Sequence, residues 1–539
     1  MIRLTQKIAI TCLLWLPFSA FSAEVPQGVT LHKTQSLTRL NPGEPITLDP
    51  GKGSSDSESS IIQDLFAGLV YLDKNNQIRP DLAESWETND GLTYLFHLRA
   101  GLKWSDGSPL KASDIVYSWR RILTETNSDY ATYLEQAGVV NASAILSGKM
   151  KGENLGVTAL DERTLQVVLE RPSATFIPML ALPYLAPVNP HNVARYGDKW
   201  TQPGHMVSSG PYALSEWKVN EKVTLIRNPF YYDNASTVID KVTYVPIVAD
   251  SAAYNRYRSG ELDISTVPLE LFNKIRESSE YGPQLRLSPY LNIYYYIFNV
   301  TKPPFNDARV RRALSLAIDR NVIANKVLGM GQIPAFLVAP EKIGGADFQN
   351  PVWSQWSQEE RNREAKKLLT EAGVGVGRDN PLSFKLLYNT NEAHRKIAIA
   401  VNSMWRKTLG ADAQLTNKEW KTLLQDMNTG AFEVVRYGWY ADYDDISSFL
   451  ELFKTGNSMN RSGYSNPDYD ILLNKAAASA DKAQRDAYYQ QALSILATDS
   501  PAIPVYQAMK VNLVKPYVGG YQTNSLKSLY TKDMYITGP

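Results

Sequence analysis

The spacing of apolar residues between Leu382 and Arg436 constrains the fold of this chain more than any other feature. It changes repeatedly between the alternation of a strand and the three- and four-residue spacing of a helix. The segments are, in order, strand, helix, strand, helix and strand: 382–386, 397–405, 411–415, 420–427 and 432–436. This βαβαβ order predicts parallel strands joined by right-handed crossovers in an open α/β sheet. Such a sheet binds ligands beyond the carboxyl ends of its strands.

The sequence RYGWYADYDD, residues 436–445, begins at that edge. An arginine, four aromatic residues and three aspartates suit neither a core strand nor an ordinary surface loop. Asp442, Asp444 and Asp445 could act as a paired acid and base, as in a glycosidase. Asp444 and Asp445 also fit the start of a helix over the apolar residues 446–450. Both interpretations stay open.

Three further patterns predict secondary structure elsewhere. Ser357 and Glu360 form a capping box that begins a helix, and Asp307 begins another. Residues 164–169 alternate as a strand. The serine-rich residues 51–60 predict a loop that caps the helix after it.

The composition excludes several classes of protein. The 539 residues are 44% hydrophobic, which predicts two or three globular domains. The 56 basic and 55 acidic residues nearly balance, so nucleic acid is not an expected partner. The five histidines are scattered, and no zinc, phosphate-loop or nucleophile-elbow motif occurs. We therefore expect no metal, no cofactor and no catalytic residue.

The N-terminus is typical of a secretory signal. Arg3 and Lys7 precede an apolar run, and Ala20 and Ser22 fit a cleavage site before Ala23. We expect residues 1–22 to be removed and the mature protein to be soluble and periplasmic, although a buried N-terminal helix is an alternative. The single cysteine of the chain lies inside this run, so we expect no lipid anchor and no disulfide in the mature chain.

Tyrosine is abundant, with 31 residues, and it clusters at 290–296 and 437–443. Such rings can form a binding surface at low entropy cost, or they can lie in the cores of strands. By strand alternation half of them must do the latter.

Five further motifs resemble the signature of one family: YLFHLR at 94–99, KWSDGSPL at 103–110, SDIVYSW at 113–119, KPPFNDARVR at 302–311 and LVKPYVGGY at 513–521. The chain resembles the periplasmic oligopeptide-binding proteins, the family 5 solute-binding proteins of ABC importers, in its oligopeptide, murein-peptide and YgiS-like branches. The resemblance implies a mixed α/β, periplasmic binding protein-like fold with two lobes joined by a hinge and an inserted β-rich domain. The implied domains are domain I (23–66, 191–290 and 510–539), domain II (67–190) and domain III (291–509).

The resemblance also implies the site residues. Asp442 would receive a peptide ammonium group, and Gly438, Trp439 and Tyr440 would hydrogen-bond the peptide backbone as an added strand would. Arg436 and His394 would bind the peptide carboxylate. Trp420 and Tyr130 would line side-chain pockets, and Tyr295 of the tyrosine cluster completes the ligand-binding set. From the residues alone, Arg436 could instead pair with Asp442, and His394 would fit a surface position.

Departures from the family pattern remove several basic anchors, at Leu328, Met427 and Gln63. The family's cysteine pair falls on Asn292 and Tyr440, so the bridge is absent and the Tyr440 side chain could enter the site. We favour short peptides as ligands, captured by lobe closure and delivered by a monomer to an inner-membrane ABC permease. A non-peptide, bile-salt-like solute and an exported hydrolase remain the alternatives.

Overall fold

The structure, a computed structural model, describes residues 23–53, 55–126, 130–375, 382–479, 481–526 and 528–538. The predicted leader, residues 1–22, lies outside the described residues, so its removal stays a prediction. Within the described ranges every helix is too short or too polar to span a lipid bilayer.

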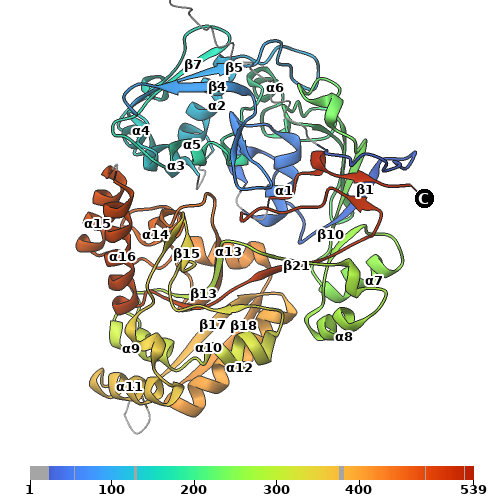
Figure 1. Ribbon diagram of the computed structural model, residues 1–539. Coiled ribbons are helices and arrows are strands. Elements are labelled where there is room, and N and C mark those ends of the chain that lie inside the picture. Colours follow the sequence, from blue (N-terminus) through green and yellow to red (C-terminus); the bar gives the residue numbers. More distant parts are fainter. Residues whose placement is uncertain are drawn as a thin grey trace, which may run out of the picture.

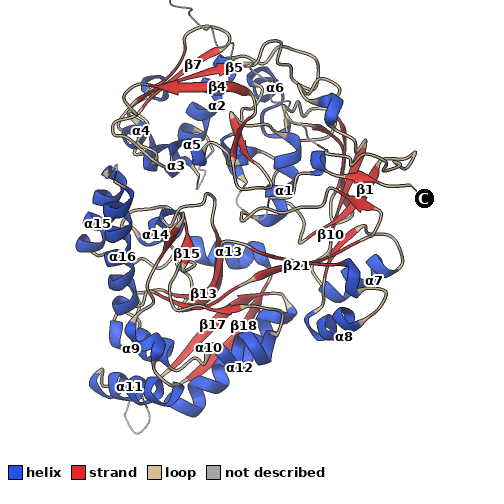
Figure 2. Cartoon of the chain, viewed as in Figure 1, coloured by secondary structure: helices blue, strands red, loops and turns tan. Residues whose placement is uncertain are grey.

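The molecule has a large lobe (residues 23–290 and 509–538) and a small lobe (residues 291–508); Figures 1 and 2 show most of the large lobe at the top, its helices α7 and α8 at the right, and the small lobe at the bottom. The large lobe contains a seven-stranded and a four-stranded sheet in its described part. The first has the order β12 (Leu285–Pro289), β21 (Met509–Val514), β11 (Ile264–Thr266), β1 (Ser36–Asn41), β10 (Lys241–Pro246), β9 (Lys222–Arg227) and β8 (Tyr212–Lys218). The second has the order β4 (Ala83–Thr88), β5 (Thr93–Leu98), β7 (Thr164–Val168) and β6 (Val157–Ala159).

The small lobe contains a six-stranded sheet of described residues. Its order is β14 (Ile333–Pro334), β20 (Ala502–Gln507), β13 (Asn292–Phe298), β19 (Val434–Tyr440), β17 (Ser383–Asn389) and β18 (Asp412–Lys418). Two-stranded pairs are β2 (Val70–Leu72) with β3 (Ile78–Pro80), β15 (Lys342–Ile343) with β16 (Ala346–Asp347), and β22 (Val518–Gly519) with β23 (Tyr535–Ile536).

Helices cover the sheets of both lobes (Figure 2). Those of the large lobe are α1 (Asp56–Leu65), α2 (Ala112–Thr124), α3 (Ala131–Gln136), α4 (Ala142–Leu146), α5 (Phe176–Met179), α6 (Pro190–Tyr196), α7 (Asp250–Arg258) and α8 (Phe272–Glu277). Those of the small lobe are α9 (Ala308–Leu316), α10 (Arg320–Val322), α11 (Gln358–Glu371), α12 (Glu392–Leu409), α13 (Trp420–Asn428), α14 (Ser447–Leu450), α15 (Pro467–Ala478) and α16 (Lys482–Asp499).

The predicted βαβαβ unit is confirmed as β17, α12, β18, α13 and β19, with β17 parallel to both other strands. The predicted strand over 432–436 is too short, because β19 continues to Tyr440. The sheet is mixed, since β13 is antiparallel to β19 and to β20.

The other predicted elements are confirmed, with one difference. The capping box at Ser357 opens α11, the Asp307 side chain caps α9, and β7 covers the predicted strand over 164–169. The predicted loop over 51–60 is shorter than expected, because α1 begins inside it, where Ser55 and Glu58 form a second capping box.

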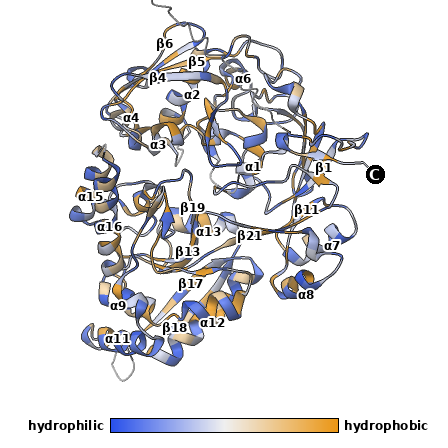
Figure 3. Ribbon diagram, in the orientation of Figure 1, coloured by the Kyte–Doolittle hydropathy of each residue, from blue (hydrophilic) through white to orange (hydrophobic). Residues whose placement is uncertain are grey.

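Each lobe has its own apolar core. Trp104 and Trp119 are buried beside the four-stranded sheet, and Phe384 and Trp405 are buried between β17 and the helices behind it. Figure 3 shows hydrophilic residues along α11, on the outside of the small lobe. A third cluster contains buried residues of both lobes, such as Tyr130 and Phe449, so apolar contacts join the lobes in this structure.

The chain passes between the lobes twice. Residues 290–291 join β12 to β13, and Ala508 joins β20 to β21. Both connections run directly from a strand of one large sheet into a strand of the other, so two short crossings of opposite chain direction link the lobes.

Candidate functional site

β19 extends past the end of its parallel neighbour β17. Leu386 and Leu387 of β17 pair with Val434 and Val435, whereas β13 pairs with β19 over its whole length. Gly438 therefore lies beyond the last pair between β17 and β19. A Cβ atom at this position would lie 3.3 Å from the carbonyl oxygen of Ile293, so a side chain here would crowd β13.

The side chains of β19 alternate between two faces. Tyr437 packs edge-on against Tyr295, with ring centroids 5.9 Å apart, on the face that also carries Trp439. Tyr440, on the face of Arg436, stacks on Tyr290 at 5.5 Å and 17°. The Tyr440 ring is therefore held against a large-lobe tyrosine at the crossing between the lobes.

Asp442 follows β19 and faces tyrosines of the large lobe. The hydroxyl of Tyr133, on α3, donates a hydrogen bond to Asp442 Oδ2. The Asp442 amide donates to Ser448 Oγ at 2.9 Å, and Trp439 Nε1 donates to the same oxygen at 3.4 Å. Burial raises the pKa of Tyr133 well above its usual value, and the Asp442 charge raises it further, so the phenol keeps its proton.

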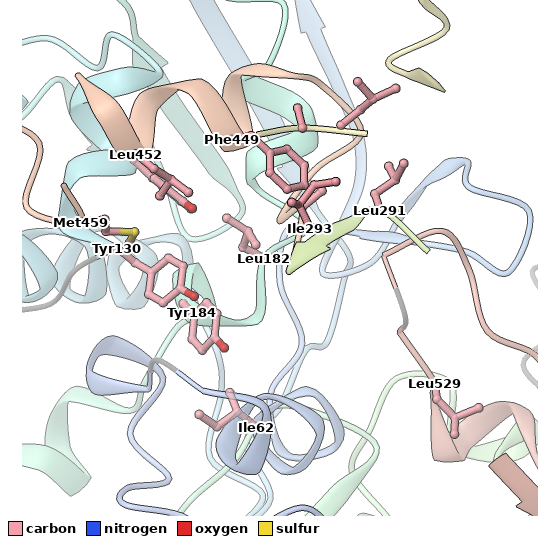
Figure 4. Close-up of a cluster of buried hydrophobic side chains, with 14 of the residues drawn as sticks. Ile62, Tyr130, Leu182, Tyr184, Leu291, Ile293, Phe449, Leu452, Met459 and Leu529 are labelled. Atoms are coloured by element: carbon pink, nitrogen blue, oxygen red, sulfur yellow. The ribbon is translucent and has the colours of Figure 1, made fainter. Parts of the chain in front are cut away.

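Three uncharged tyrosine rings, of Tyr130, Tyr133 and Tyr184, lie together on the large-lobe side of this carboxylate. Tyr130 stacks on Tyr184 with centroids 3.9 Å apart and meets Tyr133 edge-on at 5.1 Å. Figure 4 shows Tyr130 and Tyr184 between Ile62 of α1 and Met459 of the small lobe. Burial raises the pKa of the Tyr130 and Tyr184 hydroxyls well above their usual value, and the Asp442 charge adds to both shifts.

Arg436, near the other end of β19, is a cation without an acidic partner. Its guanidinium lies 4.8 Å from the Tyr294 ring centroid, and its Nη1 donates to Asn389 Oδ1 at 3.2 Å. Its buried Nε has no hydrogen-bond partner, and among the described residues no carboxylate forms an ion pair with Arg436. The alternative that Arg436 pairs with Asp442 is therefore wrong for this structure.

His394 lies beside Arg436, at the start of α12. The residue is half-buried, and its Nδ1 is shielded from solvent without a hydrogen-bond partner, so His394 lies partly inside the lobe and not fully on the surface. Burial, and then the Arg436 charge, hold the pKa of His394 well below its usual value. The imidazole is neutral, and Arg436 supplies the positive charge of this end of the site.

The remaining predicted site residues belong to the core that joins the lobes. Trp420 is the first residue of α13 and packs, partly buried, against the core that joins the lobes. Tyr295 is buried in that core beside Tyr437 and Phe453. Ligand contact by either residue stays a prediction.

The two aspartates after Asp442 have structural partners. Asp445 accepts a hydrogen bond from the Ser447 amide at the first turn of α14, as a helix start requires. Asp444 instead accepts from the Gly344 amide at 2.8 Å, so its expected place in the helix start is wrong. In the described part of the chain, no group of three or more histidine, cysteine, aspartate or glutamate residues is arranged to hold a metal.

Four residues of the site were not predicted: Tyr133, Tyr184, Asn389 and Ser448. Tyr133 stands one helical turn after Tyr130, a spacing that could have placed both rings on one face of a helix. The other three carry no sequence signal that distinguishes them from core or loop residues.

Between the two linked lobes lie a carboxylate beside tyrosine rings and, six residues earlier in the chain, a guanidinium that pairs with no acidic side chain of the described residues. A polar site between two lobes is typical of solute-binding proteins, and the fold and site place this chain in that class.

Comparison with known proteins identifies the family of this chain. Residues 77–461 match the family described as bacterial extracellular solute-binding proteins, family 5 Middle. The chain is 45% identical over 521 residues to the periplasmic oligopeptide-binding protein OppA of Escherichia coli, covering 96% of this chain and 95% of that one. It is 43% identical to the probable deoxycholate-binding periplasmic protein YgiS of the same organism, covering 96% of each. This chain belongs to the family 5 extracellular solute-binding proteins of bacteria.

The solved structures agree with that assignment. OppA of Haemophilus influenzae in complex with the peptide RPPGFSPFR superposes with a TM-score of 0.90 at 38% identity, covering 94% of this chain and 100% of that one. The murein tripeptide-binding protein MppA of E. coli gives 0.92 at 42% identity, with 95% and 100% covered. The unliganded open form of MppA gives only 0.70, with 95% and 99% covered. The lobes of this structure are therefore arranged as in the peptide complex and not as in the open form.

Proposed function

We propose that this protein captures short peptides between its lobes and delivers them to an ABC importer. The observation that carries the proposal is a pair of opposite charges along β19 and the residues just after it: Asp442 follows the strand, and Arg436, which has no acidic partner among the described residues, lies near its start. An extended peptide presents an ammonium and a carboxylate at its two ends, and each would meet the opposite charge. Peptide capture is also the activity that the names of OppA and MppA state for those proteins.

The direction and length of the ligand follow from the same geometry. With its ammonium at Asp442 and its carboxylate at Arg436, the peptide runs antiparallel to β19, and Gly438 lies where the two backbones approach. Six residues of strand span about 20 Å at about 3.3 Å per residue. An extended peptide that reaches both groups therefore has at most about six residues.

Side-chain tolerance would follow from this mode of binding. Hydrogen bonds to β19 and charge contacts at both ends use only groups that every peptide has. The aromatic rings of Tyr130 and Tyr184 give the first ligand residue an apolar neighbour that accepts varied side chains.

Closure of the lobes would provide the signal to the importer. Ligand contacts come from Arg436 and Asp442 of the small lobe and from Tyr130 and Tyr133 of the large lobe, so the ligand stabilises the closed form. In this proposal the large lobe divides into domain I (23–66, 191–290 and 510–539) and domain II (67–190), and domain III (291–509) closes over the ligand. Residues 1–22 direct the chain to the periplasm, and the protein acts without catalytic turnover.

Native mass spectrometry of the protein purified from its own periplasm tests the proposal, because a trapped ligand identifies itself by mass. We expect masses of short peptides of at most about six residues. A bound sterol-like solute would overturn the proposal in favour of the second candidate, which the 43% identity to YgiS supports. Turnover of peptides or glycosides by the purified protein would contradict the proposed lack of catalysis.

A further inference from the structure

The two crossings between the lobes are tied together by one side chain. Asn292, the first residue of β13, lies just after the crossing at 290–291. Its Nδ2 donates to the carbonyl oxygens of Tyr290 and Ala508, both at 2.9 Å, and its Oδ1 accepts from the Ala508 amide at 2.8 Å. Tyr290 belongs to one crossing and Ala508 is the other.

The Asn292 carboxamide replaces a pair of backbone hydrogen bonds. The ladder between β13 and β20 ends at the pair of Tyr294 and Tyr506, with a register shift beside it. Two residues further on, the side chain of Asn292 exchanges a donated and an accepted bond with Ala508, as a strand partner would. Gln507 adds a second link, because its Nε2 donates to the Tyr290 carbonyl at 2.9 Å.

Burial makes this link specific. Asn292 is 3% exposed, and both Nδ2 hydrogens and Oδ1 have backbone partners. An apolar side chain of the same size would leave the amide and carbonyl of Ala508 and the carbonyl of Tyr290 without these bonds. In the opposite register position stands Tyr440, whose ring stacks on Tyr290. The crossing is therefore packed on both sides of Asn292.

We propose that Asn292 is a positioning residue of the hinge, which holds the two crossings in fixed relation so that the lobes rotate about one axis. It acts through the backbone of Tyr290 and Ala508 and does not touch the ligand. By fixing the axis, it brings α3 with Tyr133 back to Asp442 at each closure. This inference rests on the proposed capture by lobe closure, but its test also has a readout without ligand.

The test measures the distance between the lobes. Because the expected mature chain has no cysteine, spin labels can be placed at Met150→Cys in the large lobe and Ile471→Cys in the small lobe, both exposed positions. We expect Asn292→Leu to broaden the distance distribution of the ligand-free protein. We also expect it to raise the Kd for a tripeptide about tenfold, the scale of lost buried hydrogen bonds.

Asn299→Leu is the matched control. Asn299 lies just after the other end of β13 and is 6% exposed, but its partners Gly430 and Thr301 both belong to the small lobe. This variant should lose stability without broadening the distance distribution. Equal distributions for Asn292→Leu and the unaltered protein would overturn the proposal, and so would equal broadening in the control.

Two measurements guard against a variant that fails to fold. Asn292→Asp keeps the acceptor for the Ala508 amide and loses both donated bonds, so it should broaden the distribution as well. In the unaltered protein, the Ala508 amide should be protected from hydrogen exchange with and without ligand, and rapid exchange would overturn the proposal. If the protein binds no peptide, the ligand-free distances and the exchange data still decide the role of Asn292.

Discussion

Replacing Asp442 by asparagine removes one charge from the site and little else. The amide oxygen of asparagine can still accept the Tyr133 hydroxyl, and the backbone bond to Ser448 is unaffected. A bound ammonium would lose its counter-charge in a site enclosed by tyrosine rings, where charge pairs are desolvated. Truncating one partner of such a pair costs about 2–5 kcal/mol, and a loss of about 3 kcal/mol raises the Kd about 150-fold.

Calorimetric titration can isolate this contribution with a double cycle. The unaltered protein and Asp442→Asn are each titrated with a tripeptide and with its N-acetylated form. Acetylation should weaken binding to the unaltered protein by about 3 kcal/mol and binding to Asp442→Asn by less than about 0.5 kcal/mol. Asp444→Asn serves as control, because Asp444 bonds to Gly344, and it should behave as the unaltered protein. An equal cost of acetylation in both proteins would refute the assigned role of Asp442.

Three further outcomes are expected. Arg436→Met should weaken tripeptide binding by about 2 kcal/mol, because the ligand carboxylate loses its cation, and an amidated tripeptide should bind both proteins equally in titrations. The neutral, half-buried His394 should lower the free energy of unfolding as the pH falls below the unfolded pKa, because there only the unfolded state gains the proton. The free energy of unfolding in urea should carry a penalty of about 1.4 kcal/mol at pH 5.5 relative to pH 7.5, absent in His394→Gln. Asp49→Ala should lower the free energy of unfolding by about 3–5 kcal/mol, because the buried Arg121 loses its two hydrogen bonds, of 3.0 and 2.6 Å, to the Asp49 carboxylate.

Two of these predictions have a control at an exposed position. Arg406→Met removes an exposed cation paired with Asp412 and should leave binding unchanged. Glu162→Ala breaks an exposed pair with Lys111 and should leave the free energy of unfolding nearly unchanged. An effect of equal size in a variant and its control would contradict the corresponding prediction.

Local patterns predicted the small lobe well. Strand alternation, helical spacing and the capping box at Ser357 are properties of short segments, so the βαβαβ unit and α11 could be located from the sequence. The end of β19 could not, because Arg436 to Tyr440 continue the strand by pairing with β13, which lies more than a hundred residues earlier. Tertiary pairing therefore decided where this strand ends.

The same distinction applies to the site. Arg436 and Asp442 could be predicted as site residues because a charged side chain at the end of an apolar strand is costly to bury without a partner. Their neighbours could not, since Tyr133 bonds to Asp442 and Tyr184 feels its charge only across the interface between the lobes, and Asn389 bonds to Arg436 only because β17 and β19 are parallel neighbours. Family resemblance supplied roles for single positions, whereas the partners of those positions required the folded chain.

The hydrogen bond from Tyr133 to Asp442 also bears on how cargo departs. The phenol bonds one oxygen of the carboxylate in this structure, so under the proposed function an arriving ammonium would exchange with a neutral donor. The reverse exchange would accompany release. Because Tyr133 belongs to the large lobe and Asp442 to the small lobe, the same bond also gives the two lobes a polar contact that is independent of the ligand side chains.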